Sequence, residues 1–108
     1  MKNTNDSIYL VNMCKMVKST SEEMIQLVMS LPDVYSDMLL NKDETSTIRY
    51  YNTKKFIQNG LNLFEGYVHN LSYVEAKKIE YAKNNFKFII DTYEQHKKLD
   101  DNLVRNYS

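Results

Sequence analysis

Apolar side chains recur along this chain at the spacing of an α-helix, and the segment 48–71 shows the pattern most clearly. At about 100° per residue, its large apolar residues fall within an arc of roughly 160°. They are Tyr50, Phe56, Ile57, Leu61, Leu63, Phe64, Tyr67, Val68 and Leu71. The phase is unbroken across Gly60 and Gly66, which predicts one continuous helix. Gly60 falls inside the apolar arc, so we expect a neighbouring helix to approach closely there; the alternative is that Gly60 caps a helix ending near Gln58.

The segment 73–99 predicts another long helix, with two separate apolar sides. Its main apolar stripe consists of Ile79, Ala82, Phe86, Ile89, Ile90 and Tyr93. The solvent side carries charges of both signs, namely Glu80, Lys83, Lys87, Asp91, Glu94 and Lys98. Val74, Tyr81 and Phe88 recur every seven residues on a separate side and widen the apolar arc to roughly 200°. A helix at the edge of a bundle needs only one apolar face, so the second stripe requires its own explanation.

The N-terminal part of the chain predicts two further helices, over about 6–18 and about 20–41. Residues 20–23 (Thr-Ser-Glu-Glu) have the form of a capping box, in which a hydroxyl and a glutamate bind free backbone amides at a helix start. Residues 72–75 (Ser-Tyr-Val-Glu) repeat this pattern. Pro32 has no amide hydrogen and strains the preceding turn, so we expect the helix either to kink there or to stop and restart.

These segments predict an all-α fold, an antiparallel bundle of about four helices in which the second helix is kinked or broken at Pro32. Short connections favour antiparallel packing of consecutive helices. Two glycines and one proline in the chain are too few for the frequent turns of a sheet protein. We expect residues 1–108 to form a single helical domain, with frayed ends at 1–5 and 100–108.

Composition narrows the classes of partner. Lys and Arg number 14, as do Asp and Glu, so the chain lacks the net positive charge typical of nucleic-acid and membrane-surface binders. No stretch approaches the ~20 apolar residues that span a bilayer, and the N-terminal segment lacks the apolar core of a secretory signal. Cys14 is the single cysteine and cannot form an internal disulfide. Together these features predict a protein that is cytoplasmic, in the source cell or in an infected host, and that does not contact a membrane.

Few side chains suggest chemistry. Cys14 lies on an apolar stripe, so we expect its thiol to be buried and inert. Glu65 and His69 are one turn apart, yet the paired Glu-x-x-His motifs of a di-metal bundle are missing from the sequence. His96 lies between the apolar and solvent sides of its helix. The sequence therefore predicts no catalytic residue, no metal and no cofactor.

The supply of apolar surface is the main functional signal. Nine Tyr, four Phe and six Met are residue types that suit protein interfaces. We therefore expect a small helical protein–protein interaction domain, acting on another protein chain as an inhibitor, immunity protein, chaperone or adaptor. The Lys-rich, Arg-poor composition is typical of AT-rich genomes and fits a phage or viral source. The alternative is a helical nucleic-acid-binding regulator, because Lys54 and Lys55 lie beside Tyr51.

The second stripe of the segment 73–99, formed by Val74, Tyr81 and Phe88, is the predicted partner-binding site. Left in water, Tyr81 and Phe88 would form an apolar patch of a kind that soluble monomers tend to avoid. Pairing of two such helices about a two-fold axis, which gives a homodimer, is the simplest solution, and a heterologous partner is the next. The alternative is that a kink at Pro32 lets the second helix wrap around the fourth and cover the stripe within the chain.

Overall fold

The computed structural model describes the backbone of residues 4–107 and the side chains of residues 8–9 and 11–102. Four helices make up this described part, and it contains no strand. They are α1 (Thr4–Asn41), α2 (Glu44–His69), α3 (Tyr73–Lys78) and α4 (Glu80–Tyr107). The prediction of an all-α bundle is confirmed. However, the helix boundaries differ from those expected, both in the N-terminal part of the chain and near Ile79.

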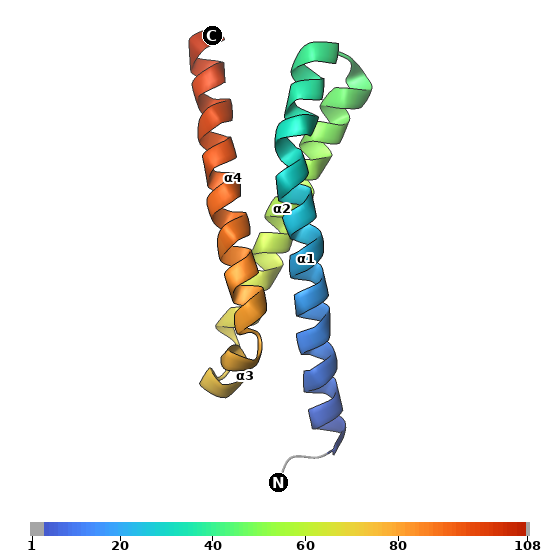
Figure 1. Ribbon diagram of the computed structural model, residues 1–108, viewed down its shortest axis with the longest axis vertical. Coiled ribbons are helices and arrows are strands. Elements are labelled where there is room, and N and C mark those ends of the chain that lie inside the picture. The colour runs from blue at the N-terminus through green and yellow to red at the C-terminus, as the bar shows by residue number, and fades with distance from the viewer. Residues whose placement is uncertain (1–3, 108) are drawn as a thin grey trace.

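Three long helices form an elongated bundle, and the short α3 connects two of them at one end (Figure 1). α1 and α4 run in the same direction, while α2 runs in the opposite direction and crosses them obliquely. The molecule measures 61 × 23 × 17 Å and has a radius of gyration of 17.4 Å. A compact domain of this length would have a radius of gyration of about 13 Å. Because the bundle is long and narrow, its interior is small and many apolar side chains remain in water.

α1 replaces two of the predicted helices. The helix start expected at residues 20–23 is wrong, because α1 runs through them without interruption. Ser21 shows why the helix continues. It is buried, its hydroxyl donates to the Lys18 carbonyl at 2.7 Å, and it accepts from the Asn85 amide at 3.1 Å. A contact with α4 thus holds the segment in helix and overrides the local capping signal.

Pro32 also lies inside α1, so the helix does not stop and restart at this residue. Its neighbours Leu31, Val34 and Tyr35 are all buried in the core. Their packing stabilises the turn around Pro32 although the proline offers no amide hydrogen. Pro32 itself is exposed, which places its ring on the solvent side of the helix.

α2 confirms the prediction of one helix through both glycines. It begins after Asp43, whose carboxylate accepts from the Ser46 amide at 2.7 Å, the usual role of an N-cap aspartate. The predicted close approach at Gly60 is also confirmed. A Cβ atom at this position would lie 2.5 Å from the Met24 sulfur of α1, so a larger residue would require the Met24 side chain to move.

The predicted single helix over 73–99 is wrong, because it is divided at Ile79 into α3 and α4. The Ser72 capping box forms as expected, with the Glu75 amide donating to the Ser72 hydroxyl at 3.3 Å. Ile79 then leaves the helical conformation (φ −111°, ψ 22°) and is buried with Val17 and Ala82 in a small apolar cluster. α4 also continues past Leu99 to Tyr107.

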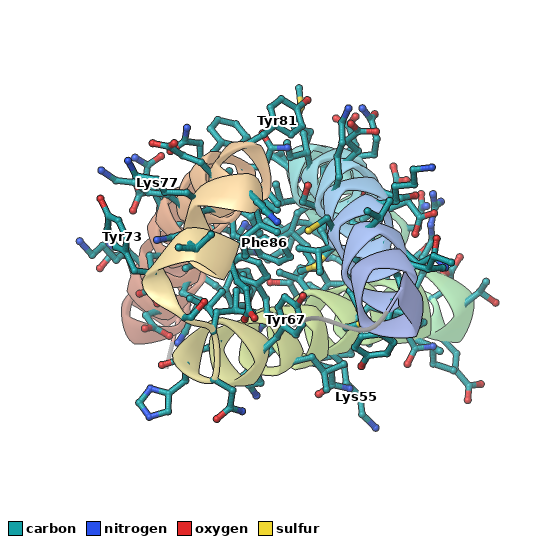
Figure 2. The ribbon with its side chains drawn as sticks, turned by 90° about the horizontal axis from the view of Figure 1, so that it is seen from below. Lys55, Tyr67, Tyr73, Lys77, Tyr81 and Phe86 are labelled. Carbon is teal, nitrogen blue, oxygen red and sulfur yellow. The ribbon has the colours of Figure 1, made fainter. Side chains whose placement is uncertain are left out.

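The main core fills the middle of the bundle, where α1, α2 and α4 meet. Its buried members are Met24, Val28, Leu31, Val34, Tyr35, Tyr50, Ile57, Phe86, Ile89 and Tyr93. Phe86 points into the space between the helices in the view along the bundle (Figure 2) and stacks on Phe64, with 3.5 Å between ring centroids. None of the four helices, over residues 4–107, contains a stretch long and apolar enough to cross a membrane.

Candidate protein-binding surfaces

A groove with mainly apolar walls lies between α1 and α2, and we refer to it as the α1–α2 groove. It consists of a cavity of about 280 Å³ and an adjoining one of about 590 Å³. The two cavities share Thr20, Gly60 and Leu63, so they form one continuous surface. Met16 lines the smaller cavity and Phe56 lines the larger one.

Large apolar side chains in this groove are strongly exposed. Leu63 is 76% exposed, Phe56 70% and Met16 55%. Met13 and Met24 add two more flexible thioether side chains to the walls. Methionine adapts its shape to different apolar partners, which is why it is frequent on surfaces that bind other proteins. The groove therefore combines exposed anchors with adaptable walls.

The sequence places Phe56 and Leu63 within the apolar arc of their helix, yet both side chains are exposed in the structure. Their helix carries an apolar arc of roughly 160°, wider than the stripe that faces a single core. Tyr50 and Ile57, on the inner side of the arc, are fully buried. The excess width of the arc was the signal that some of these side chains would remain outside.

The predicted binding stripe lies in water, but the structure divides it between two helices. Tyr81 is 55% exposed and Phe88 47% exposed, both on α4, whereas Val74 is 63% exposed on α3. The interruption at Ile79 means that Val74 no longer continues the seven-residue phase of the other two. Tyr81 projects on the side of the bundle opposite α2, as Figure 2 shows, and the Lys18 ammonium of α1 lies 5.2 Å from its ring.

A polar cluster lies in and against the core between the three long helices. We call it the Tyr50 cluster; its members are Tyr35, Tyr50, Lys54, His96 and Asp100. Asp100 is its hub: it accepts from the hydroxyls of Tyr35 and Tyr50 at 3.2 Å each and pairs with the Lys54 ammonium at 3.3 Å. The Tyr50 hydroxyl also lies 2.7 Å from His96 Nε2. The cluster therefore links α1, α2 and α4.

The Tyr50 hydroxyl contacts both His96 and Asp100, and its partners bear on the tautomer of His96. A hydroxyl carries one proton, and because an ionised carboxylate can only accept, we assign this proton to the hydrogen bond with Asp100. The short contact with His96 is then satisfied when the imidazole Nε2–H donates to the Tyr50 oxygen. Burial lowers the pKa of His96; the nearby Lys54 acts in the same direction, and Asp100 opposes both. The arrangement thus favours a neutral imidazole.

The two tyrosines of the cluster stay protonated to high pH. Burial, reinforced by the negative charge of Asp100, raises the pKa of Tyr35 to about 12. Burial and Asp100 also raise the pKa of Tyr50. Neither hydroxyl is activated as a base or nucleophile, since a raised pKa keeps each proton in place. This geometry is suited to joining three helices.

The other candidate groups are scattered. Cys14 is half-buried beside the small apolar cluster, rather than fully buried as expected. His69 is exposed at the end of α2, and Glu65 is exposed one turn earlier. Among the residues whose side chains the structure describes, no three acidic, histidine or cysteine side chains come together as a metal site would require.

The comparisons with known proteins give no further guidance. No protein family, no curated protein and no solved structure matches this chain.

Proposed function

We propose that this chain is a small helical interaction domain that binds another protein, and that the α1–α2 groove receives an apolar segment of that partner. The observation that carries the proposal is the exposure of Leu63, Phe56 and Met16 around one continuous pair of cavities. Exposed apolar groups that border a groove are typical of protein contacts. Scattered single residues would not support the same conclusion.

A helix is the segment that fits this groove best. Two antiparallel helices form its walls, and an amphipathic helix can insert apolar side chains between them at intervals of three and four residues. Gly60 lies at the middle of the groove, where both cavities meet, and the flexible Met24 thioether packs against it. Lys55 and Glu23 also line the groove and carry opposite charges. The groove thus combines apolar walls with charged groups, as protein interfaces do. Inhibitors, immunity proteins, chaperones and adaptors all act through such contacts.

The test compares two substitutions of equal chemistry. Leu63→Glu places a charge in the groove, while Leu40→Glu places one at a residue that is 80% exposed and lies outside it. Each tagged protein is used for affinity capture from cells that encode it, after nuclease treatment and at raised salt. We expect one protein to be retained by the wild type and by Leu40→Glu and to be lost with Leu63→Glu.

Two results would contradict the proposal. Equal retention of the partner by both variants would place the contact elsewhere on the molecule. Loss of all binding after nuclease treatment would instead favour nucleic acid as the ligand. Circular dichroism of both variants provides the folding control, because each substitution lies on an exposed part of a helix.

A further inference from the structure

The charges along the solvent side of α4 have a self-complementary order. Between residues 80 and 98 they form a row that consists of Glu80, Lys83, Lys87, Asp91, Glu94 and Lys98. Their signs run negative, positive, positive, negative, negative, positive, and when the order is read from the other end every sign is reversed. All six side chains are exposed. The one ion pair among the described side chains joins Lys54 to Asp100 and involves none of them. Lys97 and Asp101 are also exposed on α4, but the Lys97 ammonium lies to one side of this row, 5.9 Å from the Tyr93 ring, and Asp101 lies beyond its end.

An exposed apolar row accompanies these charges on α4. Tyr81, Phe88 and Leu99 are 55%, 47% and 57% exposed. At about 100° per residue the row lies roughly 110° around the helix from the centre of the charged side. Both sides face away from the core, into which Phe86 and Ile89 are buried. The outer surface of α4 thus has a charged flank and an apolar flank.

We propose that a second copy of this chain docks on this surface, with the two α4 helices antiparallel. The two-fold axis that relates them lies outside the molecule, at the level of Ile89 along the helix. Such an axis brings residues at equal distances on either side of Ile89 face to face. Glu80 then meets Lys98 of the second copy, and Lys87 meets its Asp91. The contact lies on a different surface from the α1–α2 groove and does not depend on what the groove binds.

The same axis also matches the apolar flank to itself. A two-fold axis perpendicular to a helix keeps each flank opposite the same flank of the other copy. Phe88 therefore lies near Phe88 of the second copy, close to the axis, and Tyr81 lies near its Leu99. Apolar contact supplies affinity, and the charges define direction and register.

Other pairings of the two helices bring like charges together. In a parallel pair every residue faces its own equivalent, so each of the six charges meets a like charge. In an antiparallel pair displaced by about one turn, the axis lies beside Lys87 or beside Asp91, and that residue faces itself. The charge order therefore selects one arrangement from among the alternatives.

The decisive experiment reverses one charge at a time and then mixes the variants. Lys87→Asp places two acidic residues opposite each other in both symmetry-related pairs beside the axis, and Asp91→Lys places two lysines opposite each other there. We expect each variant alone to dimerise at least about tenfold more weakly than the wild type, measured by sedimentation equilibrium. An equimolar mixture should recover a dimer of one chain of each kind, because its pairs are again opposite in sign.

Glu65→Lys, an exposed reversal on α2, is the matched control and should dimerise like the wild type. Circular dichroism verifies that every variant is folded.

A wild-type protein that remains monomeric at several hundred micromolar would overturn the proposal, and so would single variants that dimerise as well as the wild type. Failure of the mixture to recover a dimer would also overturn it, because the charge effect would then arise within one chain. The groove variant Leu63→Glu should dimerise normally, which separates this result from the test of the α1–α2 groove.

Discussion

The Tyr50 cluster and the α1–α2 groove distribute polar and apolar groups in opposite ways. In the cluster, tyrosine, histidine, lysine and aspartate side chains lie in or against the core, and each polar contact is paired. In the groove, Leu63 and Phe56 lie in water although nothing in their chemistry favours this. Burial of polar groups is stable only when they are hydrogen-bonded, so the cluster stabilises and orients the fold. Exposed apolar groups do not stabilise the free chain in this way. We therefore associate the groove, rather than the cluster, with binding.

The largest expected effect comes from the core that both regions border. Phe86→Ala should lower the free energy of unfolding by about 3–5 kcal/mol, because Phe86 is 2% exposed and stacks on Phe64. Chemical denaturation followed by circular dichroism measures this loss. Phe88→Ala, at a phenylalanine that is 47% exposed, should cost less than about 1 kcal/mol. Equal costs at the two positions would show that α4 is rotated relative to the described orientation.

The Tyr50 cluster should respond to loss of a single oxygen atom. Tyr50→Phe removes the hydroxyl that joins His96 to Asp100, and should cost about 1–3 kcal/mol of stability because buried polar groups lose a partner. The matched change Tyr51→Phe, at a tyrosine that is 58% exposed, should cost less than about 0.5 kcal/mol. If Tyr50→Phe leaves stability unchanged, the cluster does not join the helices.

Stability should also fall on mild acidification because of His96. Burial lowers its pKa below the usual value of about 6.5, so the unfolded chain binds a proton at a higher pH than the folded chain does. As pH falls from about 6.5 towards the folded pKa, the unfolded state is favoured progressively. The Lys54 ammonium reinforces this effect, and the Asp100 carboxylate opposes it. Denaturation curves at a series of pH values should show the decline in the wild type and a weaker one in His96→Gln. A wild-type stability that rises on acidification would contradict the assignment.

The smallest effect is expected in the groove. Leu63→Ser should change the free energy of unfolding by no more than about 0.5 kcal/mol, since the side chain is 76% exposed. Leu31→Ser, at a residue with no exposure, provides the contrast and should cost several kcal/mol by leaving a cavity and burying a hydroxyl. A large loss with Leu63→Ser would assign this leucine to the core.

The sequence predicted those features that depend on neighbouring residues. The helical class, the continuity of α2 through its glycines, the close approach at Gly60 and the Ser72 capping box all follow from spacing within a few turns. The division of the helices did not follow. Residues 20–23 have the form of a helix start, but Ser21 bonds to Asn85, a residue 64 positions later, and that contact decides the outcome.

The Tyr50 cluster was not predictable for the same reason. Tyr50 and His96 are 46 positions apart, and Tyr35 and Asp100 are 65 positions apart. No local pattern links residues at such separations. The one local indication of its burial was the placement of His96 between the apolar and solvent sides of its helix. The α4 stripe was found because its period is local, whereas the loss of Val74 from it depends on the packing of Ile79 against Val17.

The most direct test of the central claim maps the contact itself. A photo-crosslinking amino acid is placed at Leu63 in the groove or, as the control, at Leu40 outside it, and the protein is irradiated in cells that encode it. We expect a crosslink to one partner protein from position 63 and none to that protein from position 40. Equal crosslinking from both positions, or crosslinking to nucleic acid alone, would contradict a protein-binding groove between α1 and α2.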